Sequence, residues 1–374
     1  MSHQAKVGWL ELFYDLVIAA SVLVIFMSLK ADFTPENQWW LSFVVLTIFS
    51  VWLMTTLALN RLPDQSTWVR FLVFVQMGAL MLTVFTAAST GAIDDNLGMA
   101  FLAVVFLTIG GLARTVATRA GDSAMPHGYA GWGGFAVALF LGVNALTPQS
   151  FNMIALIIVF VAIVVGYFMI LLPRMDRRMP VDREHLGERL AQLLLIVMGE
   201  SFLEIAISYQ LGGRPNIIGV SAVVLLLGIT WAQYFDVLWG RGTPTTPRLL
   251  LVYLAGHAIA ILGVGTASVS LANVAITKDN AIFSTLYGTE LTHALMLTYL
   301  GFTVIAMSLR PIHPRVIAVL GGVSVILAVL GATSGGIEFL SNTQMAIVVS
   351  GVLLLAVVLC LRAIRIDQRA TSDR

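Results

Sequence analysis

Long apolar segments recur along the whole chain and constrain its fold more than any other feature of the sequence. About twelve of them reach the ~18 residues that a helix needs to cross a bilayer. Only 11% of the residues are charged, whereas soluble domains carry about 25%. A chain crossing lipid must satisfy its backbone hydrogen bonds within each segment. The sequence therefore predicts an all-α, polytopic membrane protein with about twelve transmembrane helices.

The predicted spans fall into two sets of six on either side of a densely charged segment, PRMDRRMPVDRE. Those of the first half are 8–29, 39–60, 69–90, 97–118, 127–146 and 151–172, and those of the second half are 185–209, 216–239, 248–273, 284–309, 315–333 and 342–362. The span 127–146 is the least apolar because glycines interrupt it.

Basic residues lie almost entirely on one side of this predicted topology. Of the 21 Lys and Arg residues, all but Lys30, Arg214 and Lys278 fall on the same side as the N-terminus. The positive-inside rule then predicts that both termini are cytoplasmic. The first apolar run continues to Leu29 and contains two acids, so we expect a membrane helix there and not a cleaved signal peptide.

Three residue spacings recur in the two halves. Glu11–Asp15 matches Glu188–Gln192, Arg70–Gly78 matches Arg248–Gly256, and Pro126–Gly133 matches Pro314–Gly321. An even number of helices in each unit preserves orientation, so the repeats would be parallel. We predict a first six-helix repeat at 1–173, a cytoplasmic linker at 174–184, and a second repeat with a basic tail at 185–374.

Ionisable residues inside the predicted spans are the candidates for function, because charges in hydrocarbon are costly and usually functional. The candidate ion, proton or substrate pathway consists of Glu11, Asp15, Glu188, Arg189, Glu200, Glu204, Asp236, Tyr253, His257, Glu290 and His293. Depth in the membrane suggests an inner group (Glu11, Asp15, Glu188, Arg189, Asp236) and an outer group (Glu204, Glu290, His293), with Glu200 and His257 between them.

Glu200 is the most informative of these candidates because it lies about 16 residues into its helix, or roughly 24 Å at 1.5 Å per residue. No lipid headgroup reaches that depth. A protonated glutamic acid that ties two helices together is the structural alternative to a role in transport. His257 has a similar alternative, as a neutral core histidine bonded to one acceptor.

Several other activities lack support in the sequence. There is no P-loop, GxSxG or HExxH motif, and no short-range metal-ligand motif. We therefore expect no metal and no cofactor. A formal net charge of +1 argues against nucleic acid as a partner, and the single cysteine, Cys360, excludes an intramolecular disulfide. The expected partners are the lipid bilayer and a small ion or solute, and homo-oligomer formation is left open.

Two stretches resemble the signature sequences of a known family. ELFYDLV at 11–17 and HLGERLAQLLLIVMGESFL at 185–203 are similar to those of the low temperature requirement protein A (LtrA) family of bacterial membrane proteins. YFD at 234–236 and LYG at 286–288 fit its weaker motifs. The resemblance implies a multi-pass protein of the bacterial inner membrane. Phe13, Asp15 and Ala19 also resemble the first helix of two-repeat endolysosomal cation channels.

Three functions remain open from the sequence. The first is transport of protons, cations or a small solute coupled to them, as carrier or channel, along the intramembrane acids. The second is an intramembrane enzyme acting on a lipid or isoprenoid, with Glu200 and His257 as an acid–base pair. The third is a structural or sensory membrane protein in which the acids hold helices together.

Overall fold

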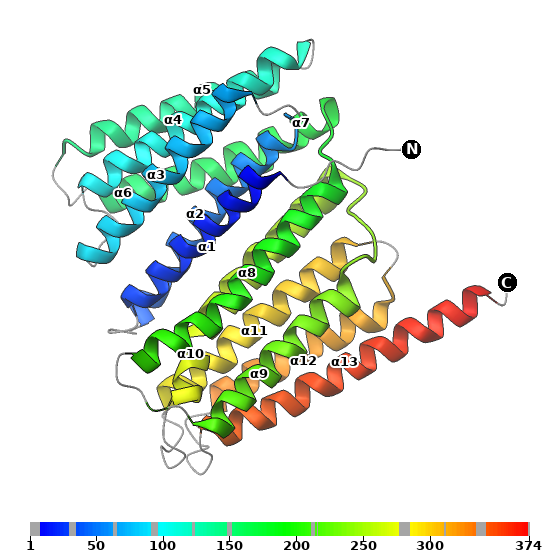
Figure 1. The fold of residues 1–374 in the computed structure, drawn as a ribbon. Helices are drawn as coiled ribbons and strands as arrows, with labels where there is room; N and C mark the ends of the chain where they lie inside the picture. The colour runs from blue at the N-terminus through cyan, green and yellow to red at the C-terminus, as the bar shows by residue number, and fades with distance from the viewer. Residues whose placement is uncertain are drawn as a thin grey trace. The chain divides into compact units, whose positions relative to one another are not determined.

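The computed structural model describes residues 8–29, 35–62, 66–90, 96–121, 124–147, 152–210, 214, 216–276, 285–309, 312–333 and 342–372. Every regular element within these ranges is a helix (Figure 1). Lys30 and Lys278, used in the orientation argument, lie outside this part of the chain, as do the first residues of the predicted spans 151–172 and 284–309.

The helices closely follow the predicted spans. They are α1 (Trp9–Leu29), α2 (Pro35–Leu59), α3 (Thr67–Thr90), α4 (Asn96–Arg119), α5 (Ala124–Asn144), α6 (Asn152–Val161), η3 (Ala162–Leu171), α7 (Leu172–Arg178), α8 (Arg183–Gln210), α9 (Ile217–Ala232), η4 (Gln233–Leu238), α10 (Pro247–Ile276), α11 (Thr285–Ser308), α12 (Pro314–Thr333) and α13 (Asn342–Ser372).

The elements α6, η3 and α7 follow one another without a break, and so do α9 and η4. The described ranges therefore contain twelve continuous helical segments. Eleven of them are long and apolar enough to cross a membrane. The remaining one is α5, the span that glycines thin out. Two predicted ends were too early, since helix continues from 172 to Arg178 and from 362 to Ser372.

The segments η3 and η4 are π-helical, with hydrogen bonds that reach five residues back. The backbone N–H of Leu172 donates to the carbonyl of Tyr167, and that of Trp239 donates to Tyr234. Pro173 follows η3 and lacks an N–H, while its ring crowds the preceding turn. A wider π turn accommodates that crowding and lets the helix continue.

Polar residues fix where several helices begin. Asp182 Oδ1 accepts the backbone N–H groups of Glu184 and His185, both at 3.1 Å, and so caps α8. Asn216 caps α9 in the same way, through Ile218 N–H at 3.0 Å. At the other end of the α9–η4 segment, Gly240 has a φ of 73°, which glycine adopts readily and other residues rarely do.

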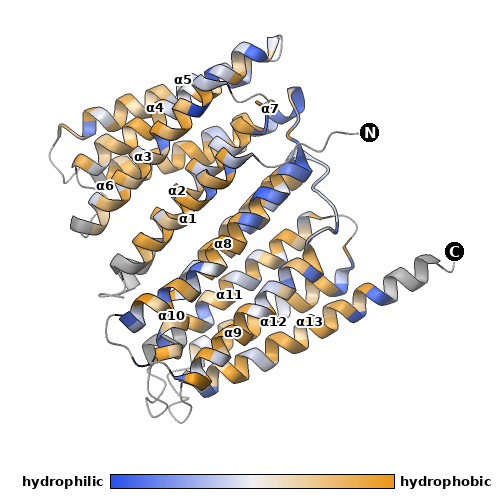
Figure 2. Ribbon diagram, viewed as in Figure 1, coloured by the Kyte–Doolittle hydropathy of each residue, from blue (hydrophilic) through white to orange (hydrophobic). Residues whose placement is uncertain are grey.

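The chain consists of two compact units, Met1–Leu193 and Leu194–Arg374, with their boundary inside α8. In the first unit, α4 packs against α3 and α5, and α1 packs against α2 and α3. In the second, α11 packs against α10 and α12, and α9 packs against α10 and α13. Figure 2 shows hydrophobic residues over most of the helices and hydrophilic ones near the start of α8. The two six-helix repeats and the cytoplasmic termini stay predictions.

Glycines bring particular helix pairs close together within each unit. A Cβ added to Gly134 of α5 would lie 2.8 Å from the Cα of Gly110 in α4. One added to Gly301 of α11 would lie 2.5 Å from the backbone nitrogen of Ala260 in α10. Gly256 also packs against α11, whereas its predicted repeat partner Gly78 has no such neighbour within 4 Å. This matched pair therefore packs differently in the two halves.

Candidate functional site: a buried ion cluster between α1 and α8

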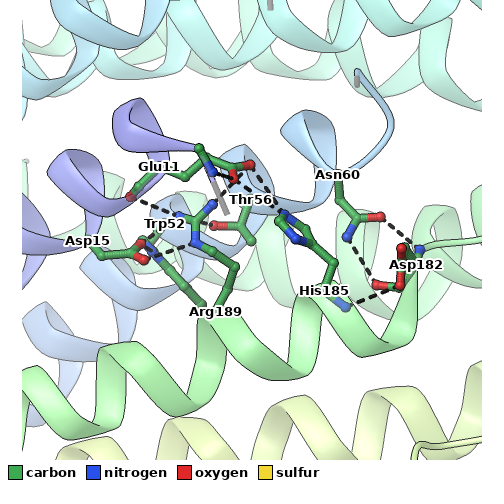
Figure 3. Close-up of polar contacts among 9 residues, drawn as sticks. Glu11, Asp15, Trp52, Thr56, Asn60, Asp182, His185 and Arg189 are labelled. Atoms are coloured by element: carbon green, nitrogen blue, oxygen red, sulfur yellow. Dashed lines mark hydrogen bonds and ion pairs between the residues drawn. The ribbon is translucent and has the colours of Figure 1, made fainter. Parts of the chain in front are cut away.

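The first turns of α1 and α8 bring four ionisable side chains together in the first unit (Figure 3). Glu11 and Asp15 are four residues apart on α1, and His185 and Arg189 are four residues apart on α8, so each pair lies on one face of its helix. We call these four residues the ion cluster. The sequence predicted the inner position of Glu11, Asp15 and Arg189, but did not include His185 among the pathway residues.

Asp15 and Arg189 form the centre of the ion cluster. Arg189 Nη2 donates to Asp15 Oδ1 at 2.5 Å and Nε donates to Oδ2 at 2.9 Å, and both side chains are fully buried. Such a two-point contact suits the planar guanidinium and holds it in a fixed orientation. Trp52 of α2 donates its Nε1–H to Asp15 Oδ1 at 2.6 Å, and the Arg189 guanidinium lies 5.8 Å from the centre of the Trp52 ring. Three helices therefore meet at this ion pair.

Glu11 is held at the outer edge of the ion cluster. Arg189 Nη1 lies 3.2 Å from Glu11 Oε1, and His185 Nε2 lies 3.4 Å from the same carboxylate. The backbone N–H of Gly8 donates to Oε2 at 3.0 Å. The Glu11 and His185 side chains keep 5% and 9% exposure, whereas Asp15 and Arg189 have none. Glu11 and His185 are therefore the least buried members of the ion cluster.

The ion cluster does not balance its own charge when His185 is neutral. Two carboxylates and one guanidinium leave a net charge of −1 in a buried setting, where an uncompensated charge is costly. Arg189 cannot release its proton. A proton on His185 would make the cluster neutral, and so would a proton or small cation on Glu11. One added positive charge would therefore neutralise the ion cluster.

The start of α8 is anchored to the end of α2 by a reciprocal pair of hydrogen bonds. Asn60 Nδ2 donates to the carbonyl of Asp182 at 3.0 Å, and the backbone N–H of Asp182 donates to Asn60 Oδ1 at 2.8 Å. Asp182 also caps α8 through its side chain. These contacts set the position of α8 relative to α2, and hence that of Arg189 relative to Trp52.

The other predicted members of the inner group are not part of this arrangement. Glu188 is partly buried and makes no hydrogen bond or ion pair with the described residues. Asp236 belongs to η4 in the second unit, where its side chain is exposed and its carbonyl accepts from Arg241 at 3.3 Å.

The deeper acids lie in the second unit. Glu200 is partly buried and has no hydrogen bond within the described part of the chain. Glu204 is 1% exposed and Glu290 4% exposed, and neither carboxylate oxygen of Glu290 has a hydrogen-bond partner among the described residues. Ser201, just before Glu204 on α8, bonds Ser268 of α10 at 2.7 Å. His293 is exposed and lies beside Gly331 of α12.

His257 forms a separate, saturated polar group with two tyrosines. Its Nδ1 lies 2.9 Å from the carbonyl of Tyr253, which can only accept, so Nδ1 carries the proton. Nε2 is then the acceptor for the Tyr234 hydroxyl at 2.8 Å. His257 is fully buried and both ring nitrogens are engaged, so the ring has no free nitrogen for an acid–base role with Glu200.

Sequence reasoning missed Trp52, Thr56, Asn60, Asp182 and Tyr234. A signal existed for Trp52, because an indole N–H in the middle of an apolar span needs an acceptor. Thr56, whose hydroxyl lies 3.5 Å from Arg189 Nη2, gave no such signal, because threonine can bond its own helix. Among the described residues, no group of three or more His, Cys, Asp or Glu side chains could hold a metal ion.

Replacing Trp52 with phenylalanine should lower the free energy of unfolding by about 1.5–3 kcal/mol, the usual contribution of a hydrogen bond to a charged group. The ring would still pack, but one oxygen of buried Asp15 would lose a donor. Unfolding in detergent measures the change. Trp231→Phe is the control, because Trp231 is 43% exposed. An equal, small effect of both variants would contradict the importance of the indole N–H.

Comparison with known proteins supports the resemblance seen in the sequence. The family model of the bacterial low temperature requirement A protein (LtrA) matches residues 6–363. An uncharacterized protein of Rhizobium meliloti (strain 1021) is 24% identical over 257 residues, which is 63% of this chain. The match spans 60% of that relative's length. No solved structure matches the chain. The family match covers both stretches that build the ion cluster, and the chain is therefore a member of the LtrA family of bacterial membrane proteins.

Proposed function

We propose that this protein moves protons, or a small cation or solute coupled to protons, across the bacterial inner membrane. The observation that carries the proposal is the ion cluster, which is buried between membrane-spanning helices and lacks one positive charge when His185 is neutral. A site that takes up and releases one positive charge is what coupling to a proton or cation requires.

We assign different roles to the residues of the ion cluster. Arg189 is bonded at two points to Asp15 and holds that carboxylate in place. Glu11 and His185 face each other at 3.4 Å at the more exposed edge, so they form the pair that exchanges a proton. With both termini cytoplasmic, as the basic residues predict, this edge would receive protons from the cytoplasm.

A second group of acids provides further positions for the transported charge. Ser201 and Ser268 fix the register of α8 against α10, and Gly301 and Ala260 fix that of α11 against α10. Glu204 lies three residues, or about one turn, beyond Ser201, and Glu290 lies eleven residues, or about three turns, from Gly301. We infer that both acids lie at a similar level along α10. Glu200 lies one turn nearer the cytoplasmic end. We propose that these three acids continue the pathway through the second unit.

Proteoliposomes test the proposal. Purified protein should move protons down an imposed gradient, as read by a pH-sensitive dye inside the vesicles. Glu11→Gln and Glu290→Gln should each reduce the rate at least about tenfold, because each removes a group that carries the charge. Glu184→Gln is the matched control, since Glu184 is an exposed acid in the first turn of α8, the helix that supplies His185 and Arg189 to the ion cluster. Control-like flux in both test variants, with normal folding, would rule out these sites.

The saturated bonding of Asp15 favours a second candidate, a purely structural role for the ion cluster. Three donated hydrogen bonds hold Asp15 in place, as expected of a group that ties α1, α2 and α8 together. In that case Glu11→Gln would lower the melting temperature and leave the flux through the vesicles unchanged. The flux and the melting temperature, measured on the same samples, separate the two functions.

A further inference from the structure

A second buried cation, Arg61, lies in the first unit, outside the ion cluster and just beyond the end of α2. Its side chain donates hydrogen bonds to two backbone carbonyls. Nη1 donates to Leu57 at 2.7 Å and Nε donates to Met179 at 3.1 Å. The residue is 3% exposed, and its third nitrogen, Nη2, is buried without a hydrogen-bond partner in the described part of the chain.

Among the residues that the structure describes, none forms an ion pair with Arg61. Asp176, a carboxylate close enough to influence Arg61, is instead bonded by Arg183 at 2.5 Å and by the backbone N–H of Val181 at 3.1 Å. Burial lowers the pKa of Arg61 from its ordinary value, and the nearby Tyr167 and Asp176 oppose that shift. A guanidinium nevertheless stays charged at physiological pH. A buried charge without an anion is costly, so a partner is expected.

A small cavity lies beside Arg61 and has room for about one water-sized species. Its polar lining comes from Arg61, Thr55 of α2, His127 of α5 and Tyr167 of η3. Apolar side chains, among them Ala113 and Met175, complete the wall. No carboxylate lines the cavity, so the only full charge at its edge is positive. The π-helical turn of η3 carries Tyr167 into this lining.

We propose that the cavity binds one small monovalent inorganic anion, of the halide class, held by Arg61 Nη2. The unpartnered guanidinium nitrogen supplies the charge and a donor, the Tyr167 hydroxyl is a further donor, and the apolar wall excludes larger anions. This site is separate from the ion cluster and does not depend on the transport proposal. Occupation would neutralise Arg61 and stabilise the packing of α2, α5 and η3 around it.

Thermal unfolding of the full chain in detergent tests the proposal, with chloride compared against gluconate at equal ionic strength. Chloride should raise the unfolding midpoint by a few degrees, and the rise should grow with the logarithm of its concentration. Arg61→Gln should abolish the chloride-dependent part. Ala113→Val should also abolish it by filling the cavity, and it decides the question if Arg61→Gln does not fold. Arg70→Gln, which removes an exposed cation of α3, should keep the full shift.

Two results would overturn the proposal. Equal midpoints in chloride and gluconate would mean that the cavity holds water. A chloride shift that persists in both Arg61→Gln and Ala113→Val would place the anion elsewhere. A bromide-soaked crystal gives a direct check, in which an anomalous peak beside Arg61 Nη2 supports the site and an empty cavity contradicts it. None of these measurements reports transport activity. Failure of the anion-site proposal is therefore distinguishable from failure of the transport proposal.

Discussion

Replacing Arg189 with methionine should lower the free energy of unfolding by about 3–5 kcal/mol, the usual cost of leaving one partner of a buried ion pair without the other. Asp15 is fully buried and would lose two of its three hydrogen bonds. Glu11 would lose its nearest cation at the same time. Chemical or thermal unfolding in detergent, compared with the wild type, measures the effect.

The double variant Asp15→Leu with Arg189→Met separates the cost of an unpaired charge from the contribution of the pair. Apolar replacement of a whole buried ion pair is often neutral or stabilising, so the double variant should recover most of the lost stability. Glu188→Gln serves as a control for altering a charge on the same turn of α8, because Glu188 makes no ion pair with the described residues. A double variant as unstable as Arg189→Met would mean that shape, and not charge, governs this site.

Adding one methyl group at Gly301 should cost about 1–3 kcal/mol of stability, the usual penalty for overpacking. The new Cβ would lie 2.5 Å from the Ala260 nitrogen and 2.7 Å from the Gly256 carbonyl oxygen. Both neighbours are backbone atoms, so α10 and α11 would have to move apart. Gly301→Ala should therefore lower the melting temperature clearly, even though alanine favours helix more than glycine does.

Gly322→Ala is the matched control for that substitution. Gly322 is exposed in the middle of α12, and an added Cβ there would have no neighbour within 4 Å. Alanine should instead stabilise α12 by about 0.5–1 kcal/mol, because it removes the entropy cost of glycine in a helix. The two substitutions are chemically identical and should have opposite signs. The same sign for both would contradict the close packing of α10 on α11.

The ion cluster shows how much of this site local sequence patterns can predict. The four-residue spacing of Glu11 and Asp15 places both acids on one face of a helix, and an arginine such as Arg189 in an apolar span needs a carboxylate partner because it cannot lose its proton. The sequence did not specify which carboxylate. Asp15 bonds Arg189 because α8 is positioned by Asn60, the last residue of the predicted span 39–60, and by Asp182 of the charged segment. Their pairing crosses 122 positions of the chain, and no local pattern reports such a contact.

The sequence by itself determined the class of protein, the number and limits of most helices, the family and the set of ionisable side chains in apolar spans. These follow from hydropathy and helix periodicity, which act over a few turns. Only the tertiary structure decided the state of each polar group, such as the saturation of His257, the pairing of Asp15 and the Arg61 Nη2 that has no hydrogen-bond partner in the described part of the chain. A buried polar group is governed by the atoms around it in three dimensions, because the low dielectric there makes each missing partner costly.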